Sequence, residues 1–156
     1  MAPAYDVAFR AWPIDLDTNL HVNNSCYFRT AELSRWRIFP QSDMLATMAK
    51  NGVMFLVAEQ TIKYMRPIAP FQKYVIRTTI TTTDNKWMNY KHVFIQHPDD
   101  VKVGKEAVTY AVIDAKAVLK EKTGKTMKAD EFLTKCNPFY RGMITQIPSA
   151  SETVAK

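Results

Sequence analysis

A single helical block set between strand-like runs is the feature that most constrains how this chain can fold. Residues 5–11 alternate between apolar and polar side chains, as a half-buried strand does. Apolar residues then recur at helical spacing from Tyr27 to Ile38, and Pro40 should end that helix because it lacks an N–H. Runs rich in β-branched and aromatic residues follow at 53–64, 74–83 and 87–97, and a last run starts at 101 or 105 and ends at 119. The pattern predicts an α+β domain in which one main helix packs on a curved antiparallel sheet of about five strands.

Short turns, such as residues 84–86, separate the long runs, so the four long strands are expected to follow one another as antiparallel neighbours. A second, shorter helix is predicted over residues 42–48, with the Asn-Gly pair at 51–52 as its stop. A third short helix is predicted over residues 130–136.

Length and composition favour one ordinary globular domain. The chain has 156 residues and a mass of 17.9 kDa, which is enough for a single domain, 1–156. Its core is expected at about residues 5–130 and a loose tail at residues 137–156. Hydrophobic residues make up 47% of the chain and charged residues 23%, so the composition is not that of a disordered protein.

The sequence shows no sign of export or of a membrane span. Cys26 and Cys136 cannot build a disulfide framework, and neither belongs to a CxxC pair. The first residues lack the basic stretch and apolar block of a signal peptide, and no apolar run is long enough to cross a bilayer. These features predict a cytoplasmic protein in a reducing compartment.

A net charge of +6 favours an anionic partner. A phosphorylated small molecule, an acidic carrier protein and nucleic acid all fit this sign. The basic residues are dispersed, however, and no nucleic-acid-binding motif accompanies them, so nucleic acid is the weakest of the three. A metal site is not expected either, because His92 and His97 lie five residues apart on one predicted strand and would face opposite sides.

The loop before the main helix concentrates groups that can carry chemistry. Residues 15–27, DLDTNLHVNNSCY, include two carboxylates, an imidazole and two amides. A helix N-terminus offers unpaired N–H groups that can hold a carbonyl oxygen as negative charge develops on it. A nearby carboxylate can attack that carbonyl or activate water, which makes a minimal acyl-transfer site. The same residue types also cap helices and form turns, so the spacing alone leaves both interpretations open.

Three segments of the chain resemble the hotdog-fold thioesterases. The best match is to their 4-hydroxybenzoyl-CoA thioesterase-like branch. The first is the loop with the helix that follows it, DxDxxxHVNNxxY and then FR and ELSRW at residues 15–36. The second is IKYMRPI at residues 62–68, and the third is the last long strand with its turn at residues 108–125. Together they cover roughly residues 5 to 130 in the family's order. The resemblance implies a hotdog fold, a curved sheet wrapped around one long central helix.

The resemblance also implies roles for individual residues. Asp17 matches the family's nucleophile or general base, and the backbone N–H of Asn24 would polarise the thioester carbonyl. Asp15 is expected to hold the loop, and Glu32 either lines the pocket as a second acid or pairs with an arginine one helical turn away. This sequence departs from the family at Leu20, where many members have Gly. Three further residues match the signature and are expected to shape the loop and pocket: His21, Asn23 and Tyr27.

The function implied is hydrolysis of an acyl thioester in fatty acid metabolism, with acyl-CoA as the first substrate candidate and acyl carrier protein as the second. No metal or redox cofactor is required. The phosphates of CoA are expected to meet Arg66, Lys73 and Lys86, which lie near strand ends. One helix cannot cover both faces of such a sheet, so a homodimer or homotetramer is predicted. The main alternative is a non-catalytic hotdog protein that binds acyl-CoA or acyl carrier protein.

Overall fold

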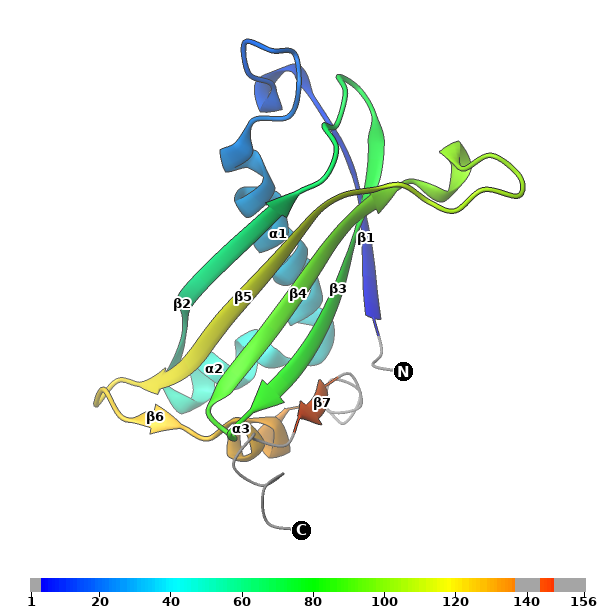
Figure 1. Ribbon diagram of the computed structural model, residues 1–156. Coiled ribbons are helices and arrows are strands. Elements are labelled where there is room, and N and C mark those ends of the chain that lie inside the picture. Colours follow the sequence, from blue (N-terminus) through cyan, green and yellow to red (C-terminus); the bar gives the residue numbers. More distant parts are fainter. Residues whose placement is uncertain (1–3, 137–143, 148–156) are drawn as a thin grey trace, which may run out of the picture.

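The computed structural model of the chain describes residues 4–136 and 144–147. Seven strands and three α-helices make up the described fold (Figure 1). The strands are β1 (Ala4–Arg10), β2 (Val53–Tyr64), β3 (Lys73–Thr83), β4 (Trp87–Gln96), β5 (Thr109–Glu121), β6 (Thr126–Met127) and β7 (Ile144–Ile147). The helices are α1 (Asn24–Ile38), α2 (Met44–Asn51) and α3 (Ala129–Lys135), with 3-10 turns η1 (Pro13–Asp15), η2 (Phe39–Ser42) and η3 (Pro98–Asp100).

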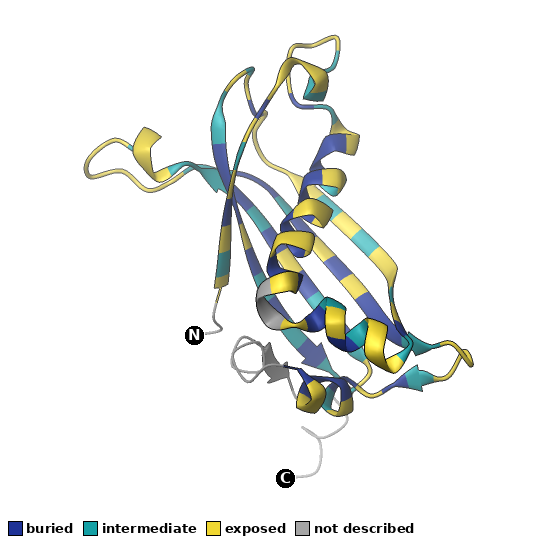
Figure 2. Ribbon diagram, turned by 180° about the vertical axis from the view of Figure 1, so that it is seen from behind, coloured by how far each residue is buried: buried dark blue, intermediate teal, exposed yellow. Residues whose placement is uncertain are grey.

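Five long strands form one curved sheet in the order β1-β3-β4-β5-β2, and α1 runs along its concave face (Figures 1 and 2). This is the hotdog fold that the sequence predicts. The expected meander is correct for β3, β4 and β5 but wrong for β2, which pairs with β5 and not with β3. The connection from β2 to β3, residues 65–72, crosses one end of the sheet. This crossing leaves β2 at the far edge with one side of its backbone unpaired within the described chain.

Part of the predicted loose tail is ordered. Residues 144–147 form β7, which runs parallel to β3 along residues 80–83. β1 covers β3 only from Lys73 to Thr79, so β7 takes up the edge of β3 that β1 leaves open. An exposed strand edge is a liability, which gives this short pairing a physical reason. The rest of the predicted tail, residues 137–143 and 148–156, lies outside the described residues.

Local signals place the ends of the helices. α1 stops at Ile38 and passes into η2, which contains Pro40, because the proline cannot continue the helical ladder. α2 runs two to three residues later than expected and ends at Gly52, whose φ of 62° is left-handed. α3 occupies nearly the predicted residues. Among the described residues no helix is both long and apolar enough to span a bilayer.

A buried polar layer divides the core into two apolar clusters. One cluster lies toward α2 and α3 and includes Tyr90 and Phe132. The other lies toward the loop before α1 and includes Tyr27, Tyr74 and Phe94. The layer between them is formed by four side chains from α1, β3 and β4: Ser34, Arg35, Thr78 and His92.

His92 is the centre of this layer. Its Nε2 lies 3.1 Å from Nη1 of Arg35, and its Nδ1 lies 2.8 Å from Oγ1 of Thr78. A guanidinium can only donate, so Nε2 must be the acceptor and Nδ1 must carry the proton that is donated to Thr78. Burial, with a smaller contribution from the Arg35 charge, lowers the pKa of His92 to about 3. The imidazole is therefore neutral, and it serves as the hydrogen-bond acceptor for the guanidinium of Arg35, a residue that is only 4% exposed.

Candidate active site

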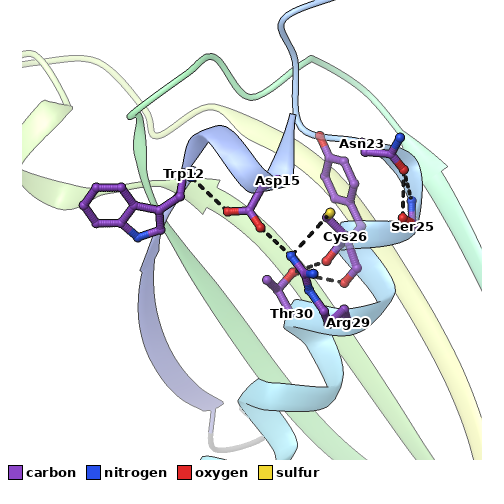
Figure 3. Close-up of polar contacts among 8 residues, drawn as sticks. Trp12, Asp15, Asn23, Ser25, Cys26, Arg29 and Thr30 are labelled. Carbon is purple, nitrogen blue, oxygen red and sulfur yellow. Dashed lines mark hydrogen bonds and ion pairs between the residues drawn. The ribbon is translucent and has the colours of Figure 1, made fainter. Parts of the chain in front are cut away.

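Asp15 fixes the loop between β1 and α1. Its Oδ2 accepts the N–H of Trp12 at 2.9 Å, and its Oδ1 accepts Nη2 of Arg29 from the first turns of α1 (Figure 3). Its carbonyl also accepts the N–H of Asn23 at 2.8 Å, directly before the helix. These bonds tie both ends of the loop to α1, which is the loop-holding contact that the sequence predicts for Asp15.

Asp17 lies at the turn of the same loop. Its Oδ1 accepts the N–H of Asn19 at 2.8 Å, and a longer contact of 3.5 Å reaches the N–H of His21. Its backbone N–H donates to the carbonyl of His21 at 2.9 Å. Its second oxygen, Oδ2, accepts no hydrogen bond from the described residues. The turn thus orients the carboxylate through one oxygen and leaves the other available.

Leu20 closes this turn in a left-handed conformation, with a φ of 57°. Its N–H donates to the carbonyl of Asp17 at 3.0 Å. A residue with a Cβ adopts this conformation at a cost of about 1–2 kcal/mol, whereas glycine adopts it freely. The departure from the family's glycine therefore leaves a left-handed backbone in place and adds an exposed side chain to the loop.

The start of α1 leaves one N–H available beside the loop. Asn23 is the N-cap, and its Oδ1 accepts the backbone N–H and the hydroxyl of Ser25 at 2.9 and 2.8 Å (Figure 3). The carbonyl of Asn23 accepts the N–H of Cys26 at 2.9 Å. The N–H of Asn24, the first residue of the helix, has no acceptor among the described residues. It points from a helix end that carries a partial positive charge.

Two tyrosines stand beside this helix start. The buried ring of Tyr27 packs edge-on against Tyr64, with 5.3 Å between ring centroids. The hydroxyl of Tyr64 lies 3.5 Å from the carbonyl of Asn24, which brings the end of β2 to the start of α1. Burial raises the pKa of Tyr27 to about 12, and the nearby charges of Tyr64 and Asp17 add to the rise. Tyr27 therefore stays protonated and is a hydrogen-bond donor at neutral pH.

The remaining predicted site residues are spread over the molecule. His21 and Arg66 are exposed at the end of the sheet that holds the loop, while Lys73 pairs with Asp99 at 3.8 Å at the start of β3. Lys86 lies at the opposite end of the sheet, where its ammonium is 4.6 Å from the ring centroid of Trp87. Within one protomer, therefore, Lys86 does not converge with the loop.

Glu32 makes neither of the two ion pairs that sequence spacing suggests. It accepts a 3.4 Å hydrogen bond from Nε1 of Trp36 on the exposed side of α1. Arg29 pairs instead with Asp15, and Arg35 turns inward to His92. The i,i+3 rule considers helix neighbours alone, and here the loop and the sheet provide the better partners.

Two hollows lie outside the candidate site. One, of about 380 Å³, lies on the outer face of the sheet and is lined mainly by polar side chains. The other, of about 730 Å³, lies between β1, η1 and α1 and is lined by Asp15 and Arg29, among others. Neither is lined by Asp17, Asn24 or Tyr27. These three residues belong to the loop and the first turn of α1, and Tyr64 at the end of β2 contacts Asn24 and Tyr27. We call this region the corner.

The fold and one sequence comparison together define the class of the protein. The sheet wraps a central helix, as in the hotdog fold. The loop that carries Asp17 precedes Asn24, the first residue of that helix, whose N–H has no acceptor among the described residues. A profile of the Thioesterase-like superfamily matches residues 11–136, and the chain belongs to this superfamily.

Named relatives are consistent with this membership. Protein THEM6 of Xenopus laevis is 33% identical over 88 residues, which are 56% of this chain and 42% of that protein. The long-chain acyl-CoA thioesterase FadM of Escherichia coli is 28% identical over 101 residues, which are 65% of this chain and 76% of FadM. The match to the first of these relatives thus spans less than half of its length.

The fold also matches a solved structure. A mutant 4-hydroxybenzoyl-CoA thioesterase, crystallised with 4-hydroxybenzoyl-CoA, superimposes with a TM-score of 0.71 over 86% of this chain and 99% of that one. The two sequences are 13% identical, so this likeness concerns the fold.

Sequence reasoning did not select Tyr64 or Arg29 as parts of the site. Tyr64 ends the IKYMRPI segment, so the signal was present in the motif, but its contact with α1 depends on the position of β2 in the sheet. The role of Arg29 could not be predicted without knowing the direction of the Asp15 side chain. Both are long-range contacts that spacing along one element cannot reveal.

Proposed function

We propose that this protein hydrolyses acyl-CoA to a free acid and CoA at the corner formed by Asp17 and Asn24. The observation that carries the proposal is the unpaired N–H of Asn24 at the positive end of α1, preceded in the same loop by the Asp17 carboxylate, which has one oxygen without a donor among the described residues. The superfamily membership and the name of FadM support a thioester substrate. Acyl carrier protein is the second substrate candidate.

The chemistry follows from these two groups. The thioester carbonyl oxygen accepts the N–H of Asn24, and this hydrogen bond strengthens as negative charge develops on the oxygen. Oδ2 of Asp17 attacks the carbonyl carbon or removes a proton from an attacking water. Collapse of the tetrahedral species breaks the C–S bond, and the CoA thiolate leaves. After direct attack, the acyl group stays on Asp17 as a mixed anhydride, which water then hydrolyses to the free acid. After attack by water, the free acid forms directly, and the proton held by Asp17 passes to the thiolate. His21 and Asn23 are proposed to hold the loop and the helix start in place while this happens.

A homodimer completes the site in this proposal. β2 is twelve residues long, pairs only with β5 in the described sheet, and exposes several apolar side chains: Met54, Leu56, Val57 and Tyr64. A long apolar edge strand is a template for another strand, and a second copy supplies one. Because Tyr64 ends β2 beside Asn24, pairing at this edge would wall the corner. A homotetramer built from two such dimers remains the further prediction.

The phosphates of CoA are proposed to bind basic residues at the loop end of the sheet. Arg66 and Lys73 lie at that end, and Arg66 has no carboxylate within ion-pair distance among the described residues. Lys86 could take part only if it came from a partner subunit, because it lies at the other end of its own sheet. The proposal needs no metal or redox cofactor.

A cytoplasmic role in fatty acid metabolism is proposed on two grounds. Cys26 is a free, buried thiol, as is usual in a reducing compartment. FadM, by its name, acts on long-chain acyl-CoA.

The second candidate function is non-catalytic binding of acyl-CoA, and one observation favours it. Oδ1 of Asp17 accepts the N–H of Asn19, so the carboxylate also has a purely structural use as a turn former. Both functions use the same corner, but only hydrolysis requires the charge of Asp17.

A panel of acyl-CoAs and an acyl carrier protein substrate tests the proposal, with release of the free thiol as the readout. We expect turnover of at least one acyl-CoA. Binding by calorimetry without thiol release would favour the binding protein. If the folded protein neither binds nor hydrolyses any of these substrates, both functions are rejected.

A further inference from the structure

Four large apolar side chains stand exposed at the end of the molecule where the loop before α1 lies. We call them the tip patch: Trp12, Ile14, Leu20 and Phe71, which are 54%, 84%, 65% and 54% exposed. They come from η1, the Asp17 loop and the β2–β3 connection, all at the top of Figure 1. Trp12 and Phe71 meet edge-on, with 6.4 Å between ring centroids. The patch is therefore a protruding set of loop tips, apart from the edge of β2.

The backbone under this patch is strained. Five non-glycine residues of the described chain have a positive φ, and three of them are Asp or Asn, which tolerate that conformation. The other two are Leu20 and Phe71, with φ values of 57° and 61°. This conformation is unfavourable for a residue with a Cβ, and because both side chains are exposed, no burial within this chain offsets it. Strain of this kind is found where a side chain is held for a purpose other than stability.

Unpaired positive charge lies directly behind the patch. The hollow of about 730 Å³ between β1 and α1 is lined by Trp12 and Ile14. Four basic residues, Arg10, Arg29, Arg37 and Lys73, and two acidic ones, Asp15 and Asp99, also line it. Arg10 donates to the carbonyl of Phe71 at 3.1 Å, and its guanidinium carbon lies 5.9 Å from the Trp12 ring centroid. The guanidinium carbon of Arg37 lies 5.2 Å from the ring centroid of Phe9. Neither arginine has a carboxylate within ion-pair distance among the described residues.

A like-charged pair adds to this field. Arg10 lies directly opposite Lys73 in the β1–β3 register, and both line the same hollow. Like charges at opposed positions destabilise a sheet unless an anion lies near them. The ammonium of Lys73 lies 3.8 Å from the carboxylate of Asp99, whereas the guanidinium of Arg10 donates only to the carbonyl of Phe71. The hollow is thus short of negative charge.

We propose that the tip patch and the hollow behind it dock the protein on a membrane surface that carries anionic lipids. Trp12, Ile14 and Phe71 would enter the interface between headgroups and acyl chains, where aromatic residues with apolar neighbours partition favourably. Arg10 and Arg37, one step back from the tip, lie at the depth of the lipid phosphates and supply the charge complementarity. The patch belongs to loop tips and not to a groove, which suits a deformable bilayer better than a folded partner. This docking does not depend on catalysis, although its hollow shares Lys73 with the proposed CoA phosphate site.

Flotation of the full chain with lipid vesicles tests this inference. We expect binding to phosphatidylcholine vesicles that contain phosphatidylglycerol, little binding to phosphatidylcholine alone, and weakening by salt. Trp12→Ser should weaken partitioning by about fivefold, and Trp12→Ser with Phe71→Ser by at least about tenfold. Trp36→Ser is the matched control, because Trp36 is a comparably exposed tryptophan on α1 (48%) outside the patch, and it should leave flotation unchanged.

The charge is tested separately. Arg10→Gln with Arg37→Gln should lower binding to anionic vesicles by about fivefold per charge removed. The matched control replaces Lys102 and Lys105, exposed on the β4–β5 loop, with glutamine and should change little. The inference is overturned if the wild type fails to float with anionic vesicles, in which case the patch is left to a protein partner. Equal loss in the patch variants and their controls overturns it too. Flotation needs no turnover, so it succeeds or fails independently of thioesterase activity.

Discussion

The neutral state of His92 makes the stability of this fold depend on pH in a way that one substitution can isolate. In the unfolded chain the imidazole has an ordinary pKa of about 6.5, while in the folded state its pKa is about 3. Below about pH 6.5 the unfolded chain binds a proton that the folded protein does not bind. Stability from this group is therefore complete above pH 6.5 and is lost progressively as the pH falls toward 3.

The size of the effect follows from linkage. Between about pH 7.5 and about pH 5.5, protonation of one unfolded-state histidine with pKa 6.5 removes about 1.4 kcal/mol of unfolding free energy. His92→Gln should abolish this loss, because glutamine does not titrate. Its amide oxygen can accept from Arg35 and its amide N–H can donate to Thr78, so both bonds of the layer are kept.

Urea unfolding of the wild type and His92→Gln at the two pH values measures this difference. We expect the wild type to lose about 1.4 kcal/mol more than the variant over that interval, since all other titrating groups are common to both. Equal losses would refute the assignment of a buried neutral imidazole. His92→Ala, which leaves the Arg35 guanidinium buried without its acceptor, should cost about 3–5 kcal/mol at about pH 7.5. This cost should shrink at lower pH, because alanine does not share the wild type's loss.

Three further substitutions test other parts of the structure. Leu20→Val should unfold at least about 1 kcal/mol more easily than Leu20→Gly in thermal denaturation, because a β-branched residue tolerates a positive φ worst. Equal stability would mean that the left-handed turn is not retained in solution. Asn23→Ala should lower the unfolding free energy by about 1 kcal/mol through loss of the N-cap, whereas Asn23→Asp should not, as urea denaturation would report. Leu56→Lys on the outer edge of β2 should reduce a dimeric mass to that of a monomer in light scattering, and a wild type that is already monomeric would contradict the proposed dimer.

Local sequence signals predicted most elements of this fold, and the errors have a common physical origin. The period-two pattern of residues 5–11, the helical spacing up to Ile38 and the stop at residues 51–52 each report on a single element, and each element is present. The position of β2 at the far edge depends on where the β2–β3 connection crosses the sheet, which no local pattern encodes. The pairing of β7 with β3 likewise depends on an edge left open by β1.

The candidate site shows the same division. A cap among the polar residues before α1 and Asp15 as the holder of the loop could be predicted, because both act on backbone groups a few residues away. The ion pair of Asp15 with Arg29 and the inward direction of the Arg35 side chain could not be predicted, because each depends on a partner that is distant in sequence. Asp17 keeps its predicted place in the loop, and its chemistry stays a prediction until turnover is measured.

The kcat of Asp17→Asn with the best acyl-CoA substrate of the wild type tests the central claim most directly. Asparagine keeps the oxygen that accepts the N–H of Asn19, so the loop and the melting temperature should change little, whereas the charge needed for attack or proton removal is lost. The account predicts that kcat falls by at least about 10²-fold, the usual contribution of a general base. Asp15→Asn serves as the structural control, and its melting temperature should fall because the ion pair with Arg29 is lost. A folded Asp17→Asn variant with near-normal kcat would contradict the account and assign the chemistry to another group, with Glu32 the next to test.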